Sequence, residues 1–299
     1  EYLELVGFPN EDPDLIRKKH NVGPQPVSLS LAHLNPNSDI TVYDNYTVTE
    51  KADGERHLIF ISKDGKVYGF NSNLNRVTYL GFDGISTNYR NSLLDSEIIK
   101  DHKGKKRCLL FDAYFVGGKN VAGLRLMDSK SDNRISKLLG LLKNNAKLSK
   151  HEGNIVFSVK KFKPFSKSPH SKILRIGAQS IINDIKYDGY DYETDGLIFT
   201  PICPIPENVR GRTWNKILKW KPAKDNSIDF YVRTVQESCN AKDNCTQIHK
   251  DLVTTKHQST IRYKQLLLHV GFDAKKHNVK YNIKDLIAKG VIEKQGVTK

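Results

Sequence analysis

A single lysine stands between two β-patterned runs, in the segment Thr49–Arg56 with the sequence TEKADGER. The flanking residues are rich in β-branched and aromatic side chains, which are typical of strands. Asp53–Gly54 is a turn dipeptide. The pattern therefore predicts a strand, a tight corner and then a hairpin, with strand residues at 40–43, 46–48, 57–61 and 66–70.

Lys51 at the end of this strand is a candidate nucleophile. An amine attacks only when it is unprotonated, and the ordinary lysine pKa of about 10.4 keeps it charged at neutral pH. Nearby cations and partial burial favour the neutral amine. Asp-Gly occurs five times in this chain, so the segment taken alone also fits a plain turn.

The charge balance favours a polyanionic partner. Forty-eight Lys and Arg against 33 Asp and Glu give a net charge of +15, which suits RNA, DNA or a nucleotide, although a solvated lysine-rich surface gives the same balance. No apolar run approaches the roughly 20 residues that span a bilayer. With 38% hydrophobic residues in 299, the chain has enough apolar material for a real core.

The four cysteines form no paired CxxC set, so the sequence favours a reducing intracellular compartment over a disulfide framework or structural zinc. The chain has no leader-like N-terminus and begins with Glu1 rather than Met, from which we expect a piece of a longer polypeptide. Residues 1–40, punctuated by five prolines, are expected to form an N-terminal segment that packs on the outside.

Acidic side chains occur inside apolar strand patterns. In residues 93–99, alternation places Asp95 and Glu97 on one face. Carboxylates in a strand are costly to bury unless they meet cations or a metal, so this face is predicted to line a polar cleft. A central strand is predicted at residues 107–116, and residues 73–80 predict another. From it Arg76 could reach a phosphate or ribose, although by itself the pattern fits an exposed strand arginine better.

Helical spacing from residue 135 to 142 predicts a helix of about four turns with Asp132 as N-cap, and residues 172–186 predict a second amphipathic helix. A strand is predicted between them at residues 155–159. Strands interleaved with two helices indicate a mixed α+β domain.

Two lysines alternate with apolar residues near residue 220. Lys219 and Lys221 share one face, either as solvated side chains of an edge strand or as two cations that converge on a phosphate. The pattern changes past Pro222, so we predict a boundary near Ala223 that divides domains 1–223 and 224–299. In the second domain the sequence predicts strands at 227–233 and 261–270 and a helix at 281–289.

Five motifs resemble, in order, those of the covalent nucleotidyltransferases, the superfamily of mRNA capping guanylyltransferases and of ATP-dependent DNA and RNA ligases. The resemblance covers about residues 46–233 and is most like the multifunctional capping enzymes of large cytoplasmic DNA viruses. The motifs are KADGER from Lys51, LDSE from Leu94, LFD from Leu110, DGLIF from Asp195 and LKWKP from Leu218.

The resemblance implies an α+β nucleotidyltransferase domain of ATP-grasp-like ligase/capping type, with antiparallel sheets and flanking helices. A partial OB-fold-like module would follow, and its late Arg-x-Asp-Lys-type motif is not found before Lys299, so we expect it to be incomplete. Within this family, Lys51 would attack the α-phosphate of GTP, expel pyrophosphate and form lysyl-N-GMP. The GMP would then pass to the 5′-diphosphate end of RNA.

The resemblance also implies the site residues and partners. Arg56 and Glu97 would hold the ribose, Phe111 and Ile198 would sandwich the purine, and Lys163 would donate to guanine O6. RNA triphosphatase and cap methyltransferase domains would be fused in a longer cytoplasmic viral protein without a membrane association. The implied sets are Lys51, Lys219 and Lys221 for catalysis, Asp195 and Glu97 for Mg²⁺ or Mn²⁺, and Glu50, Ala52, Arg56, Arg76, Glu97, Phe111, Lys163 and Ile198 for the nucleotide.

Two alternatives stay open at this stage. The same lysine chemistry serves an ATP-dependent polynucleotide ligase, which differs in its nucleotide. A basic RNA-binding module with vestigial nucleotidyltransferase residues would be no enzyme at all.

Overall fold

The chain separates into two compact units, residues 1–225 and residues 226–299. The computed structural model describes residues 1–12, 14, 16, 18–43, 45–128, 132–150, 155–163, 172–187, 189–223, 230–234, 249–253, 259–263 and 266–269. The domain boundaries inferred from the sequence stay predictions.

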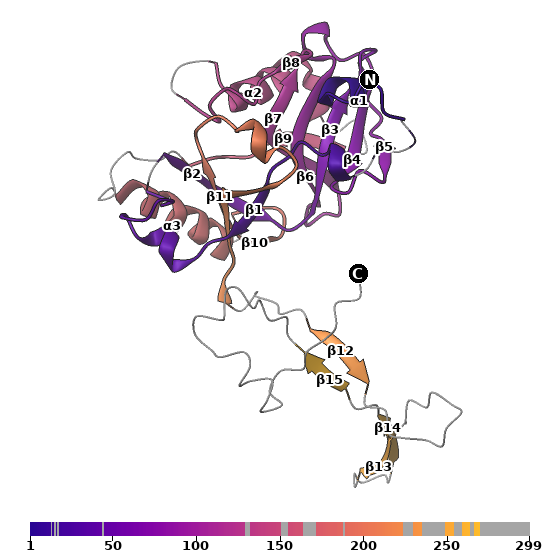
Figure 1. Cartoon of the computed structure of the whole chain (residues 1–299), viewed down its shortest axis with the longest axis vertical. Helices are drawn as coiled ribbons and strands as arrows, with labels where there is room; N and C mark the ends of the chain where they lie inside the picture. Colours follow the sequence, from indigo (N-terminus) through magenta and orange to yellow (C-terminus); the bar gives the residue numbers. More distant parts are fainter. Residues whose placement is uncertain are drawn as a thin grey trace. The chain divides into compact units, whose positions relative to one another are not determined.

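Two sheets build the first unit (Figure 1). In the larger sheet the strand order is β5-β4-β3-β6-β7-β8, with β9 parallel to β7 and the other pairs antiparallel. Its strands are β3 (Glu55–Ile61), β4 (Val67–Asn71), β5 (Val77–Tyr79), β6 (Ser92–Lys100), β7 (Lys106–Val116), β8 (Lys119–Asn120) and β9 (Ile155–Val159).

The smaller sheet has the order β1-β11-β10-β2. Its strands are β1 (Gln25–Ser28), β2 (Tyr46–Ala52), β10 (Thr194–Pro201) and β11 (Thr213–Trp220). Helix α3 (Lys172–Lys186) packs against β2 and β10, and Figure 1 shows it along this sheet. The short connecting helices are η2 (Lys18–His20), η3 (Leu31–Leu34), η4 (Thr87–Tyr89), η5 (Ala146–Ser149) and η6 (Glu207–Val209).

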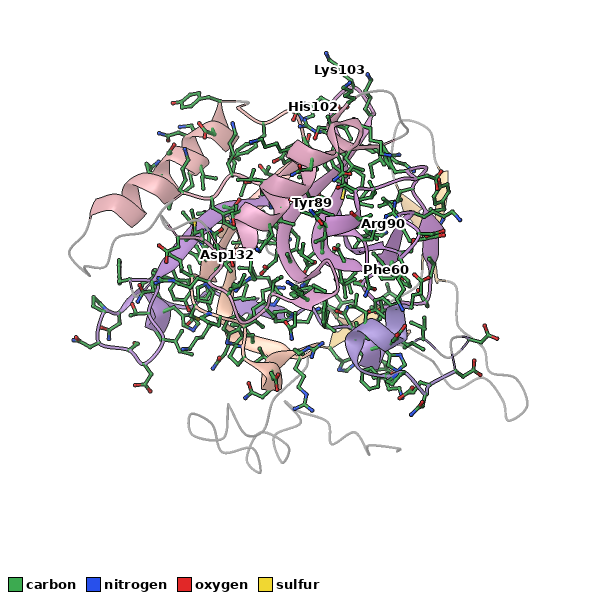
Figure 2. All side chains as sticks on the ribbon, turned by 90° about the horizontal axis from the view of Figure 1, so that it is seen from above. Phe60, Tyr89, Arg90, His102, Lys103 and Asp132 are labelled. Atoms are coloured by element: carbon green, nitrogen blue, oxygen red, sulfur yellow. The ribbon has the colours of Figure 1, made fainter. Side chains whose placement is uncertain are left out.

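Alternation along the strands of the larger sheet divides its apolar side chains between two clusters. Ile59 and Ile61 of β3 lie in a core with Leu138 of α2 (Arg134–Asn144), whereas Leu58 and Phe60 lie on the opposite face. This second face packs against α1 (Tyr2–Val6), and it is the face from which the site is built. Phe60, labelled in Figure 2, is 5% exposed. The predicted α+β class is therefore confirmed.

The corner at Asp53–Gly54 connects the two sheets. Strand β2 ends at Ala52 in the smaller sheet, and β3 begins at Glu55 in the larger one, where it pairs with β6. A side chain at Gly54 would place its Cβ 2.5 Å from the Ile98 carbonyl oxygen, so only glycine fits this crossing. The corner thus leads from one sheet to the other, and the predicted hairpin follows it, since β3 pairs with β4 in antiparallel fashion.

The expectation for residues 1–40 was wrong. Tyr2 of α1 stacks on Phe70 and packs edge-on against Phe60, both in the core. Strand β1 joins the smaller sheet parallel to β11, with an irregular register between Gln25 and Val27. Pro26 has no N–H to donate, which an edge strand tolerates.

Three local predictions also need correction. Residues 40–43 form a turn, because Val42 donates its N–H to the His33 carbonyl. In the predicted strand 73–80, only β5 forms, since the Asn71 side chain accepts the backbone N–H groups of Asn75 and Arg76 and holds a turn. Helix α2 is capped by Asn133 rather than by Asp132. The helix predicted at 172–186 matches α3, and the strand predicted at 155–159 matches β9.

In the second unit, the described strands form two antiparallel pairs. Strand β12 (Tyr231–Thr234) pairs with β15 (Leu266–His269), and β13 (His249–Val253) pairs with β14 (Ser259–Tyr263). The OB-like module stays a prediction, and the expected helix at 281–289 lies outside the described residues. None of the helices in the described part of the chain combines the length and apolar character that a bilayer crossing requires.

We expect Gly196→Ala to destabilise the first unit. Gly196 has φ +147°, and an added Cβ would lie 1.9 Å from the Trp220 carbonyl oxygen, so the β10-β11 pair must part. The loss of unfolding free energy should be about 2 kcal/mol or more, measured by chemical denaturation. Gly123→Ala is the matched control, because a Cβ there meets nothing within 4 Å. Equal stabilities of the two variants would contradict the prediction.

Candidate active site

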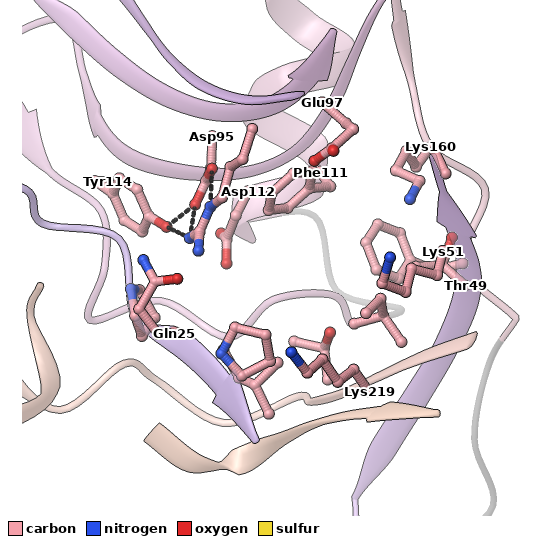
Figure 3. A pocket seen from close by; sticks show the side chains of 18 residues that line it. Gln25, Thr49, Lys51, Asp95, Glu97, Phe111, Asp112, Tyr114, Lys160 and Lys219 are labelled. Carbon is pink, nitrogen blue, oxygen red and sulfur yellow. Dashed lines mark hydrogen bonds and ion pairs between the residues drawn. The ribbon is translucent and has the colours of Figure 1, made fainter. Parts of the chain in front are cut away.

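A cavity lies where the two sheets meet, and its space, including the open mouth, is about 950 Å³ (Figure 3). The smaller sheet contributes Lys51, Ile198 and Lys219, and the larger sheet contributes Arg56 and Phe111. The complete described lining is Pro24, Gln25, Pro26, Thr49, Lys51, Ala52, Arg56, Asp95, Glu97, Phe111, Asp112, Tyr114, Lys160, Phe162, Ile198, Thr200, Ile217 and Lys219.

Asp195 joins two of the predicted lysines. Lys51 Nζ lies 2.6 Å from one carboxylate oxygen of Asp195, and Lys221 Nζ lies 2.6 Å from the other. Burial acts to raise the pKa of Asp195, but hydrogen bonds from Lys221 and Lys51 outweigh it, so the pKa is lowered. Asp195 is therefore an anion at neutral pH. Lys219, which lies in β11 two residues before Lys221, lines the cavity itself.

A buried carboxylate holds Arg56. Arg56 Nε and Nη2 lie 2.9 and 2.5 Å from the two oxygens of Asp95, a bidentate pair whose carboxylate is 0% exposed. The Tyr114 hydroxyl donates to the same carboxylate, and burial raises the pKa of Tyr114, which keeps it a donor. Such a pair fixes the guanidinium plane. Arg56 is thus rigidly placed at the cavity wall.

Phe111 presents a ring between two cations. The guanidinium of Arg56 lies 5.8 Å and the amine of Lys160 lies 5.9 Å from its ring centroid. Ile198 lines the same cavity from β10. An aromatic and an aliphatic side chain in one cavity suit a planar base.

Glu50 and Lys163, both predicted to contact the nucleotide, are not among the described residues that line the cavity. The side chain of Glu50 is 1% exposed and is not among the described lining residues. Alternation along β2 turns it away from the face that carries Thr49 and Lys51. Lys163 pairs through its backbone with Val48, and its Cβ approaches Gly177 of α3. Lys160 lines the cavity in its place.

Arg76 is not part of this arrangement. It is exposed, directly before β5 at the edge of the larger sheet, and two strands separate it from β6. The structure therefore separates Arg76 from the other predicted nucleotide-binding residues. Ala52, by contrast, lines the cavity as expected.

Several cavity residues escaped the sequence analysis. Pro24 and Gln25 come from the N-terminal segment, whose pattern gave no sign of a site. Asp112 belongs to the LFD motif but had no predicted role; it is bound by the fully buried Arg134, whose Nε lies 2.7 Å from its Oδ1. Tyr114 could have been predicted, since it lies two residues after Asp112 in the strand predicted at residues 107–116 and so shares its face. Lys160 could have been found as the first lysine after β9.

A divalent cation has a limited set of donors here. In the described part of the chain, no group of three or more His, Cys, Asp or Glu side chains is arranged to hold a metal. Magnesium and manganese also bind through one or two carboxylates together with substrate phosphates and water. The ionised Asp195 and the cavity carboxylate of Glu97 fit that mode.

A catalytic-domain family matches most of the chain. The sequence model of "mRNA capping enzyme, catalytic domain" matches residues 14–223, so the chain belongs to this family. This match confirms the resemblance carried by the five motifs.

The relatives include proteins named as mRNA-capping enzymes. The "probable mRNA-capping enzyme" of Acanthamoeba polyphaga mimivirus is 30% identical over 69% of this chain and 21% of that protein. The mRNA-capping enzyme subunit alpha of Schizosaccharomyces pombe is 31% identical over 71% of this chain and 53% of that protein. This chain thus spans about a fifth to a half of these relatives.

Among solved structures, the ATP-dependent DNA ligase of bacteriophage T7 in complex with ATP is 12% identical, with a TM-score of 0.42 over 90% of this chain and 87% of that one.

We expect Glu97 to make stability depend on pH. Burial raises the pKa of Glu97 to about 7, against the opposing charge of Lys160. Because the folded state then holds this proton more tightly than the unfolded state, stability should fall as pH rises from the usual glutamate range to about 7, and this contribution should level off above.

Glu97→Gln should remove that slope and be the more stable form above pH 7. Denaturation of both proteins across this range, without nucleotide or divalent cation, measures the difference. If the stabilities of the wild-type protein and of Glu97→Gln change with pH in parallel, the raised pKa is not that of Glu97. Glu55→Gln, an exposed glutamate in β3, serves as control.

Proposed function

We propose that this chain is an mRNA guanylyltransferase domain that forms a covalent lysyl-N-GMP and transfers GMP to the 5′-diphosphate end of RNA. The observation that carries the proposal is the position of Lys51. Its amine lies in the cavity, 2.6 Å from an Asp195 carboxylate that also binds Lys221, with Lys219 nearby in the lining.

In the first step, the Lys51 nitrogen attacks the α-phosphorus of GTP. A P–N bond forms, the bond from phosphorus to the bridging oxygen of the β-phosphate breaks, pyrophosphate leaves, and the proton lost by the amine passes to solvent. The phosphorus centre gains negative charge in the transition state, so preplaced cations lower the barrier. Lys219 and Lys221 supply such charge from one strand end.

The remaining lining residues suit the nucleoside. Phe111 and Ile198 would hold the purine, and Arg56, fixed by Asp95, would hold the ribose with Glu97 close by. We assign the contact to guanine O6 to Lys160 instead of Lys163, because Lys160 lines the cavity. A Mg²⁺ or Mn²⁺ ion held by Asp195 and Glu97 would add positive charge beside the phosphates.

In the second step, an oxygen of the RNA 5′-diphosphate attacks the phosphoramidate phosphorus, the P–N bond to Lys51 breaks, and the departing Lys51 nitrogen takes up a proton. The product is the GpppN cap. An RNA triphosphatase makes such diphosphate ends, and a cap methyltransferase acts on the product. We include both as fused partner domains, together with a cytoplasmic site of action, in this proposal.

We expect Lys51→Ala to abolish covalent attachment while the fold is retained, because the side chain lies in the cavity and carries no core packing. The measurement incubates protein with α-labelled GTP or ATP and Mg²⁺ or Mn²⁺. It then asks whether label remains on denatured protein and is released by acid but not by alkali. Lys103→Ala, an exposed lysine of the β6-β7 connection, is the control.

The outcomes separate the candidate functions. Label from GTP supports the guanylyltransferase, and label from ATP alone would indicate a ligase. Full labelling of Lys51→Ala would refute the mechanism. A protein that takes label from neither nucleotide but binds RNA would fit the RNA-binding module.

We also expect Lys219→Ala and Lys221→Ala each to slow attachment by roughly 100-fold, because each removes a cation next to the developing phosphate charge. Single-turnover labelling at saturating GTP measures this rate. Lys216→Ala is the matched control, since Lys216 is an exposed lysine of the same strand. Wild-type rates for both variants would show that these lysines do not act on the phosphate.

A further inference from the structure

The residue before the candidate nucleophile in β2, Glu50, carries a buried carboxylate. Glu50 is 1% exposed, and one of its carboxylate oxygens lies 3.2 Å from Lys160 Nζ, whose side chain is 5% exposed. Lys160 Nζ also donates to the Glu50 backbone carbonyl at 2.6 Å. Two charges removed from water in this way need each other, because removing one leaves the other buried and unpaired.

The other contacts of Glu50 fix its carboxylate. The Tyr192 hydroxyl donates to Oε1 at 2.9 Å, and the Thr49 hydroxyl donates to Oε2 at 2.6 Å. Burial and the Glu50 charge raise the pKa of Tyr192, so that the hydroxyl stays protonated and remains a donor. Both carboxylate oxygens of Glu50 therefore accept hydrogen bonds from hydroxyl groups, which fix the position of the carboxylate independently of Lys160.

The ammonium group of Lys160 has three N–H donors. One donates to the Glu50 backbone carbonyl, and the ammonium group also forms an ion pair with the Glu50 carboxylate. Lys160 also lines the cavity, and its amine lies 5.9 Å from the Phe111 ring centroid (Figure 3). The ammonium group thus keeps donor capacity for the cavity side, beside the ring on which a base would lie.

We propose that Glu50 is a positioning residue for base selection. It holds Lys160 so that one N–H of the ammonium group donates to a carbonyl oxygen at the edge of a purine, and Tyr192 holds Glu50 in turn. This inference rests on the proposed function. An oxygen at that position accepts the N–H, whereas the amino group of adenine presents hydrogens to it and leaves a buried ammonium donor unmatched. Such mismatches discriminate strongly between ligands.

The test measures lysyl-nucleotide formation by the whole chain with α-labelled GTP and with 2-aminopurine riboside triphosphate, which lacks the carbonyl oxygen. In Glu50→Gln, the KM for GTP should rise roughly tenfold or more, and the preference for GTP should fall by a similar factor, because a charge-assisted hydrogen bond loses its alignment. The rate at saturating GTP should fall less than KM rises. Tyr192→Phe should shift both quantities in the same direction by less.

Two comparisons separate positioning from general damage. Lys160→Met sets the limit of the effect, and the double variant Glu50→Gln/Lys160→Met should show no further loss of preference, because Glu50 acts through Lys160. Glu193→Gln is the control, since Glu193 follows Tyr192 in the sequence but has an 81% exposed side chain. Thermal melting confirms that each variant is folded.

The inference is overturned if folded Glu50→Gln keeps the wild-type preference, or if the losses in the double variant add. Should Glu50→Gln fail to fold, Tyr192→Phe decides, and an unchanged preference there overturns it. A wild-type protein that takes label from neither GTP nor ATP contradicts the proposed function instead. The two failures are therefore distinguishable.

Discussion

The change of sheets at Asp53–Gly54 is the constraint on which the site depends. Ala52 is the last residue of a strand paired with β10, and Glu55 is the first of a strand paired with β6. The chain can make this crossing because Gly54 lacks a side chain where the Ile98 carbonyl would meet it. As a result Lys51 and Arg56, five residues apart, reach one cavity from different sheets, and a nucleotide between them would contact both.

The charges around this cavity are arranged as partnered groups. Asp195 binds Lys51 and Lys221, Asp95 binds Arg56, and Glu50 binds Lys160. Each partner offsets part of the cost of removing its counterpart from water. These groups also fix directions, since Asp95 holds the plane of the Arg56 guanidinium, and Glu50 binds Lys160 through a hydrogen bond and an ion pair. The cavity can therefore present preplaced cations to a triphosphate without first reorganising.

Local patterns predicted much of the fold. β-branched and apolar runs predicted the strands that carry Lys51, Asp95 and Phe111, and helical spacing predicted α3. Predictions failed where a side chain bound the backbone, as Asn71 does before β5. They also failed where a buried residue such as Tyr2 belongs to a segment whose prolines suggested an external position. Strand β1 could not be foreseen, because its partner β11 lies almost 190 residues further along the chain.

The sequence by itself determined which chemistry is available: one lysine at a strand end, acids and lysines on alternating positions, and their order along the chain. Only the tertiary structure decided which of them act together. Glu97 is the direct cross-strand neighbour of Arg56, yet the guanidinium pairs with the diagonal Asp95, and Lys160 enters the cavity in place of Lys163. The reason is physical: spacing along a strand sets the face on which a side chain lies, whereas its partner is set by packing between strands that are distant in sequence.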